Sequence, residues 1–180
     1  MAKARTNLQL PVLLGFHATI AGGFLVSYLT GDGDDVYFMH VFSGYVVLAA
    51  LALRMAIGVL APPGSMLRLP RPDRGAIAGF LRGAAALERG VLLKRSPLHG
   101  PMAVALLAGL TAAAASGAVA DFVLSAEDLH EALGEAALFI VIAHVALVLA
   151  LHGAKRVATP RAAEPAATSL SATSRTGGAP

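Results

Sequence analysis

Four long apolar segments separated by polar connections dominate the hydropathy pattern of this chain. They run from about Leu8 to Leu29, from Val36 to Ala61, from Pro101 to Val123 and from Leu129 to Leu151. A helix needs about 20 apolar residues to cross the hydrocarbon layer of a bilayer, and each segment has that length. Because a helix satisfies its own backbone hydrogen bonds in hydrocarbon, the pattern predicts an all-α integral membrane protein built as a four-transmembrane-helix bundle.

The rest of the chain predicts two further features. In the long connection between the second and third segments, the stretch from Gly75 to Lys94 places apolar residues mostly at steps of three and four. This spacing is typical of a helix, and we expect it to lie in the cytoplasmic membrane interface. After Arg156 the chain consists mainly of Ala, Pro, Ser, Thr and Gly, which predicts a disordered tail over residues 157–180. Residues 1–156 are then the folded domain.

Charge is divided unevenly between the connections. Of the 14 lysines and arginines, all but Arg54 lie before the first segment, between the second and third, or after the fourth. The other two connections contain acidic residues and no base. By the positive-inside rule, both termini and the long connection are therefore cytoplasmic. The pI near 9.7 then reflects contact with lipid headgroups rather than nucleic-acid binding.

Composition narrows the possible chemistry. Hydrophobic residues make up 56% of the chain and charged residues only 14%, whereas soluble domains have about 25% charged residues. There is no cysteine, so disulfides, thiolate haem ligation and cysteine-held iron–sulfur clusters are excluded. Histidine is the remaining residue type with strong metal-binding chemistry, and ionisable groups inside membrane spans are usually functional.

The histidines of the apolar segments match in depth as two pairs. His130 and His144 are 14 positions apart, so they share one helix face at a separation of about 21 Å along the axis. Given the predicted orientation, His17 lies at the same depth in the membrane as His144, and His40 lies at the same depth as His130. This predicts an inner pair (His17 and His144) and an outer pair (His40 and His130), which would suit two bis-histidine haems. The structural alternative is interhelical hydrogen bonding by the same side chains.

Two glycines and an arginine accompany these histidines. Gly44 and Gly134 each follow an outer-pair histidine by four positions, where a missing side chain would leave room for a porphyrin. The alternative is that small residues let transmembrane helices approach closely. Arg54 lies 14 positions after His40, at the depth of the inner pair. There it would contact a haem propionate or extend to the inner headgroups.

Other polar residues near the spans have less specific roles. His99 and His152 are expected at the inner rim as interfacial residues, with His152 as the second choice of ligand if His144 does not serve. Glu131 and Glu135 lie near the outer surface. They would be rim groups, a proton path, or hydrogen-bond acceptors that orient an imidazole, and the sequence leaves all three open.

Several stretches resemble one known family. Met39-His40-Val41-Phe42-Ser43-Gly44-Tyr45, continuing to Arg54, resembles the second helix of the bacterial cytochrome b561 and nickel–iron hydrogenase b-type cytochrome family. Further similar stretches cover about Leu10 to Arg156: Tyr28-Leu29-Thr30-Gly31, Arg95-Ser96-Pro97-Leu98-His99-Gly100-Pro101, and Leu129-His130-Glu131 through to His144. The stretch from Pro11 to Ala18 lacks the arginine and the tryptophan that flank the first histidine in the family.

The resemblance implies a multi-pass cytochrome of the bacterial inner (plasma) membrane. It implies two b haems held by His17, His40, His130 and His144, carrying electrons between a periplasmic redox partner and the quinone pool or a respiratory complex. The periplasmic partner would be a c-type cytochrome or a hydrogenase-like redox subunit. Membrane lipid and quinone are thus expected partners, and nucleic acid is not.

Two other functions remain open at this point. One is a membrane anchor subunit of a hydrogenase-like redox complex that binds one haem or none, which the missing arginine before His17 favours. The other is a metal transporter that uses membrane histidines, although the two pairs lie about 20 Å apart and no acidic ligands accompany them at mid-membrane. Whether the chain is an electron-transfer subunit or itself a quinone-linked oxidoreductase is also left open.

Overall fold

The computed structural model describes residues 2–86, 88–92 and 96–158, and these residues are arranged entirely in helices, turns and loops. Four of the helices are long and apolar enough to cross a membrane: α1 (Ala2–Leu29), α2 (Tyr37–Leu60), α5 (His99–Ala120) and α6 (Glu127–Ala158). The prediction of an all-α chain with four long apolar helices that could cross a membrane is therefore confirmed. Most of the predicted tail, residues 159–180, lies outside the described residues.

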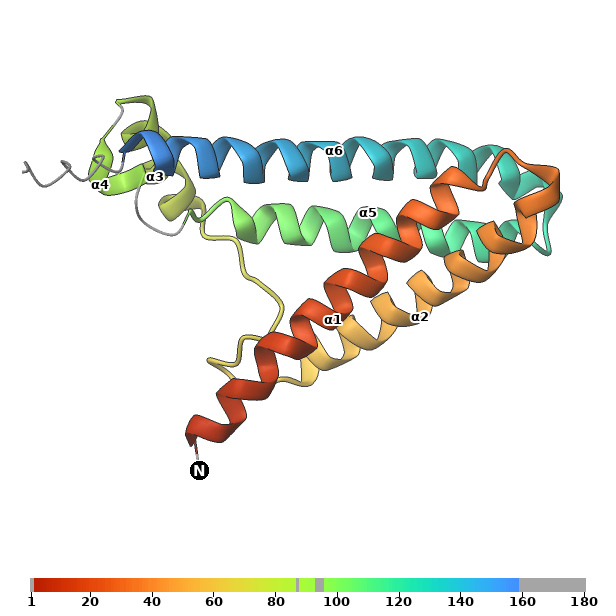
Figure 1. Cartoon of the computed structure of the whole chain (residues 1–180), viewed down its shortest axis with the longest axis horizontal. Helices are drawn as coiled ribbons and strands as arrows, with labels where there is room; N and C mark the ends of the chain where they lie inside the picture. The colour runs from red at the N-terminus through yellow and green to blue at the C-terminus, as the bar shows by residue number, and fades with distance from the viewer. Residues whose placement is uncertain (1, 87, 93–95, 159–180) are drawn as a thin grey trace, which may run out of the picture.

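The long helices form two antiparallel hairpins, α1 with α2 and α5 with α6 (Figure 1). Each hairpin loop ends in one turn of 3-10 helix, η1 (Asp34–Val36) in the first and η2 (Leu124–Ala126) in the second. A glycine allows close packing within each hairpin. A Cβ on Gly23 would lie 2.7 Å from Val47 Cγ2, and a Cβ on Gly109 would lie 2.7 Å from Ile140 Cδ1. Such close approach supports helix association in lipid, where burial of apolar surface gives little driving force.

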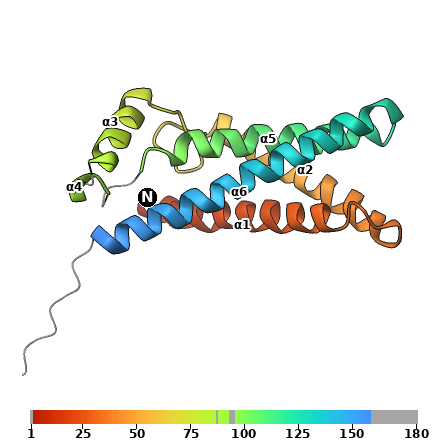
Figure 2. The ribbon, with the colours of Figure 1, turned by 90° about the horizontal axis from the view of Figure 1, so that it is seen from above.

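The two hairpins cross at an angle, and their closest packing is between α2 and α5 (Figure 1). Seen from above, α6 passes across the first hairpin (Figure 2). Buried apolar side chains from α2, α5 and α6 form the core between the hairpins: Val47, Leu51, Leu110, Ala113 and Ala137. Ala137 is midway in sequence between His130 and His144, so the core lies between the two predicted histidine levels.

Most large apolar side chains on the spans point away from this core. Phe42, Leu53 and Phe139, for example, are more than half exposed. In water such an exposed surface would be unfavourable, but it suits helices that are surrounded by lipid. The structure is therefore that of a multi-pass membrane protein with a small internal core.

Helix boundaries differ from the hydropathy limits in the second hairpin. α5 spans His99–Ala120, whereas the predicted span continued to Val123. α6 starts at Glu127 and continues to Ala158, beyond the predicted end of the domain at Arg156. α5 is shorter because Phe122 and Val123 are apolar but lie in the loop between α5 and η2. α6 is longer because hydropathy marks only the part of a helix that suits hydrocarbon. Acidic residues in the first turn of α6 and basic residues in its last turn stabilise helical ends outside that layer.

The helix predicted between Gly75 and Lys94 is broken into two. α3 (Arg74–Ala85) is followed by the short helix α4 (Arg89–Leu92), and Lys94 lies outside the described residues. Val91 packs closely on Gly83, where a Cβ would lie 2.7 Å from Val91 Cγ2. This contact folds α4 back onto α3. The apolar periodicity indicated helix correctly, but it gave no sign of the turn.

Leu51 provides a test of the core because its side chain is 0% exposed. Leu51→Ala is expected to lower the free energy of unfolding by about 2–4 kcal/mol, since it leaves a cavity between the hairpins. Leu53→Ala is the matched control, because Leu53 is 55% exposed, and its expected loss is below about 0.5 kcal/mol. Unfolding of the detergent-solubilised variants by sodium dodecyl sulfate, followed by circular dichroism, measures both. Equal losses would contradict this placement of the core.

Candidate functional site

Four of the six histidines form two pairs that bridge the hairpins. The ring centroids of His40 on α2 and His130 on α6 are 5.8 Å apart, with 68° between the ring planes. Those of His17 on α1 and His144 on α6 are 6.5 Å apart, with 51° between the planes. The pairing that helix depth predicted is therefore present in the structure. α6 contributes one histidine to each pair, and α1 and α2 contribute the partners.

The centroid separations fit one metal ion between two imidazoles. A metal–imidazole bond is about 2 Å long, and each ring nitrogen lies about 1 Å from its centroid. Two imidazoles on opposite sides of one ion therefore have centroids about 6 Å apart. The observed values of 5.8 and 6.5 Å lie on either side of this distance. Each pair would supply two imidazole donors, and paired imidazoles are among the protein ligands that hold haem iron.

A backbone carbonyl of α1 fixes the tautomer of His40. His40 Nδ1 lies 2.8 Å from the Ser27 carbonyl oxygen and 3.4 Å from Ser27 Oγ. A carbonyl can only accept a hydrogen bond, so Nδ1 carries the proton and donates it. Nε2 is then left with a free lone pair, which is the form of histidine that binds a metal.

His130 is held in the same way by α5. Its Nδ1 lies 3.0 Å from the Ala113 carbonyl oxygen and 3.2 Å from Ser116 Oγ. Ser116 Oγ itself donates to the Ala113 carbonyl at 2.8 Å, so its lone pairs remain free to accept from Nδ1. Both outer-pair imidazoles are therefore oriented by the neighbouring helix of their own hairpin. This is the support that metal-binding histidines usually have.

The glycines around the outer pair fall into two groups. Gly117 lies directly under a ring, because a Cβ there would lie 2.8 Å from His130 Cε1. Gly44 and Gly134, which the sequence had singled out, border open space instead. A Cβ on Gly134 would meet no atom within 4 Å, and one on Gly44 would meet only Ser27 Oγ, at 3.7 Å. Gly44 and Gly134 are therefore not in tight contact with a neighbouring helix, unlike Gly117.

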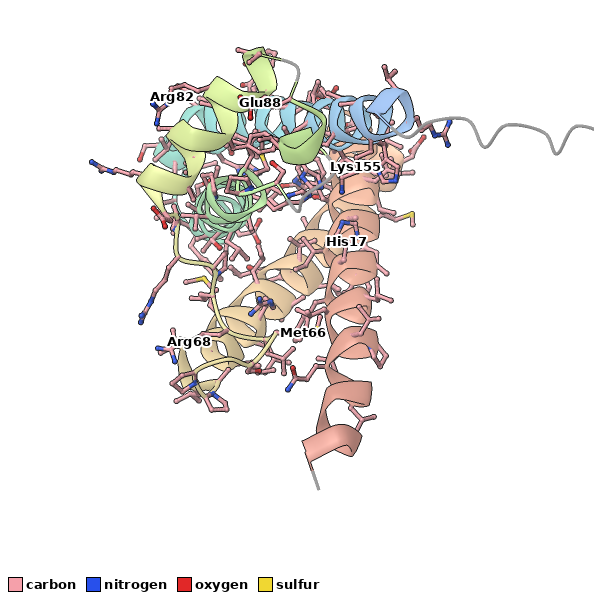
Figure 3. All side chains as sticks on the ribbon, turned by 90° about the vertical axis from the view of Figure 1, so that its left-hand side faces the viewer. His17, Met66, Arg68, Arg82, Glu88 and Lys155 are labelled. Atoms are coloured by element: carbon pink, nitrogen blue, oxygen red, sulfur yellow. The ribbon has the colours of Figure 1, made fainter. Side chains whose placement is uncertain are left out.

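The inner pair lacks this support. His17 is exposed on α1 (Figure 3), and His144 is half-buried on α6. Within the described residues, the buried His144 Nδ1 has no hydrogen-bond partner. An unpaired polar atom inside a protein is costly, so such an atom points to a missing ligand or partner. The inner pair therefore has suitable donors, but in the part of the chain that the structure describes no carbonyl orients its rings as in the outer pair.

Arg54 contacts the long connection. Its Nη1 donates to the Leu67 carbonyl at 2.8 Å, so in this structure Arg54 fastens that connection to α2. A contact with a haem propionate stays a prediction. His99 donates from Nδ1 to the Ser96 carbonyl at 2.9 Å, and His152 is exposed near the end of α6. Among the described residues, neither ring makes a contact with another histidine ring like those within the two pairs.

Sequence reasoning missed the residues that support the outer pair. Ser27 and Ser116 precede His40 and His130 by 13 and 14 positions, respectively. A serine 13 or 14 positions before a histidine could have indicated these contacts, because a short hairpin loop places two such positions at the same depth on adjacent helices. The family resemblance includes Tyr45 but predicts no contact for it. Its hydroxyl donates to the Asp121 carboxylate at 2.8 Å and links α2 to the loop after α5.

The fold and the site together define a multi-pass membrane protein in which two histidine pairs bridge two helical hairpins. No family model, no curated protein and no solved structure matches the chain. Its function must therefore be inferred from its own residues.

Proposed function

We propose that the protein is a b-type cytochrome that transfers electrons across a membrane through two bis-histidine haems. His40 and His130 would hold one haem, and His17 and His144 the other. The observation that carries this proposal is the presence of two imidazole pairs, with ring centroids 5.8 and 6.5 Å apart. The histidines that α6 contributes to them, His130 and His144, are 14 positions apart. The sequence resemblance to the cytochrome b561 and hydrogenase b-type cytochrome family agrees with it.

A bis-histidine haem supplies one-electron transfer and leaves no coordination position open for oxygen chemistry. The chain's own residues would position it. The Nδ1–H groups of His40 and His130 donate to carbonyls, which keeps the rings oriented and makes each Nε2 a stronger donor. Gly44 and Gly134 would leave space beside the outer pair. The buried Leu51 and Ala137 would help to exclude water from the layer between the two levels.

The proposed partners follow from the resemblance and from the charge distribution. Electrons would pass between the quinone pool or a respiratory complex and a periplasmic c-type cytochrome or hydrogenase-like subunit, with the chain in a bacterial inner membrane. The acidic hairpin loops would then face the periplasm, and the basic connection the cytoplasm.

A second candidate function is that of a membrane anchor subunit with a single haem. The difference between the two pairs favours it, because among the described residues carbonyls accept hydrogen bonds from both outer-pair histidines and from neither inner-pair histidine. The exposed His17 would in that case be a lipid-facing residue, and His144 would not bind iron.

A haem count separates these functions. The protein is purified in detergent from cells with adequate haem supply, and its pyridine haemochrome spectrum is compared with the protein concentration. Two b haems per chain are expected. One haem per chain would favour the anchor, and no haem would overturn the cytochrome proposal.

A further inference from the structure

The connection after α2 forms an open hollow of about 350 Å³. It contains none of the paired histidines, and the proposed electron transfer does not use it. Its lining comes from a short stretch of the connection: Pro63, Gly64, Arg68, Leu69 and Arg71.

The hollow is braced against α2 by specific contacts. Arg54 Nη1 donates to the Leu67 carbonyl at 2.8 Å, and the Leu69 N–H donates to the Gly58 carbonyl at 3.2 Å. A Cβ on Gly58 would lie 2.7 Å from Leu69 Cγ and 2.8 Å from Arg54 Nη1. Glycine at this position is therefore what lets the connection lie against the helix.

A second contact braces the same stretch against α1. The Met66 N–H donates to Gln9 Oε1 at 3.0 Å, and Figure 3 labels Met66 and Arg68 on the connection that follows α2. Gly64 has a φ of 83°, in the left-handed region that favours glycine, and so provides the turn into the hollow. Arg68 and Arg71 thus belong to a segment that hydrogen bonds hold against both α1 and α2.

The charge of the hollow is uncompensated. Within the described residues, the guanidinium groups of Arg68 and Arg71 have no hydrogen bond or ion pair. The acidic residue next in sequence, Asp73, caps α3, where its Oδ1 accepts from the N–H groups of Gly75 and Ala76 at 2.9 and 3.2 Å. Arg68 and Arg71 thus border a hollow whose exposed lining is mainly apolar, and unpaired guanidinium groups beside an apolar surface favour a ligand that is both anionic and partly apolar.

We propose that this hollow binds the phosphate of an anionic phospholipid headgroup. The planar, forked guanidinium group matches phosphate oxygens, and basic pockets at the cytoplasmic ends of spanning helices suit such headgroups. The hollow follows directly after the last turn of α2, where Val59 and Leu60 are 69% and 83% exposed. An apolar surface for acyl chains therefore adjoins the charge, which favours a lipid over free phosphate.

Lipid binding to the delipidated, detergent-purified full chain tests the proposal. Native mass spectrometry measures the affinity for phosphatidylglycerol and for phosphatidylcholine. The wild-type chain should prefer phosphatidylglycerol, and the double variant Arg68→Gln/Arg71→Gln should bind it at least about tenfold more weakly. Arg71→Gln alone, at an exposed position, should give an intermediate loss. Circular dichroism checks that each variant remains helical.

The matched control removes two other charges from the same connection. Arg74→Gln/Arg82→Gln changes the net charge equally, and Arg82 lies on α3, apart from Arg68 in Figure 3. This control should keep wild-type affinity within about twofold. An equal loss in both double variants would show general charge attraction and overturn the site. Displacement of phosphatidylglycerol by equimolar inorganic phosphate would assign the hollow to free phosphate and overturn the lipid assignment.

Discussion

Replacing His130 with alanine is expected to remove one of the two proposed haems and to leave the other in place. The substitution deletes one imidazole of the outer pair, whose centroids are 5.8 Å apart, and a single axial histidine would hold a haem weakly. His17 and His144 lie at a different level of the bundle and are untouched. The pyridine haemochrome content should therefore fall from two haems per chain to one, with little change in helical content.

The reciprocal substitution and a matched control complete this experiment. His144→Ala should also leave one haem, because it breaks the inner pair and leaves the hydrogen-bonded outer pair intact. His152→Ala removes an exposed, unpaired histidine from the same helix, so it should keep both haems. If His130→Ala and His152→Ala contained the same amount of haem, the outer pair would not be a haem site.

The pairing of the histidines could be predicted because it depends on quantities that the helical backbone fixes. Rise per residue and rotation per residue set the depth and the face of His130 and His144 once the spans are assigned. The distribution of basic residues then orients the spans and gives the depths of His17 and His40. None of these steps requires knowledge of side-chain packing, and the observed pairs agree with them.

The supports of the site could not be predicted in this way. The carbonyl that a ring nitrogen meets depends on how far each helix is rotated within its hairpin, and that rotation is set by contacts such as Gly23 with Val47. The contact from Arg54 to Leu67 depends on the path of an irregular, proline-containing connection. Helix periodicity contains no information about that path.

Gly134→Leu is expected to prevent haem binding at the outer pair without destabilising the haem-free protein. A Cβ at Gly134 would meet no atom within 4 Å, so the leucine would extend into open space beside the pair. Replacing a helical glycine also removes a propensity cost of up to about 1 kcal/mol. One haem per chain should be lost, while the thermal unfolding temperature of protein made under haem depletion should stay equal or rise.

The control for this variant is Gly153→Leu, on the same helix near its far end. A Cβ at Gly153 also meets no atom within 4 Å, so the two substitutions add the same side chain to equally open positions. Only Gly134 lies one turn from a paired histidine, and only its substitution should change the haem content. A lower stability of haem-free Gly134→Leu would instead favour close helix packing at this glycine, since a leucine would then force the helices apart.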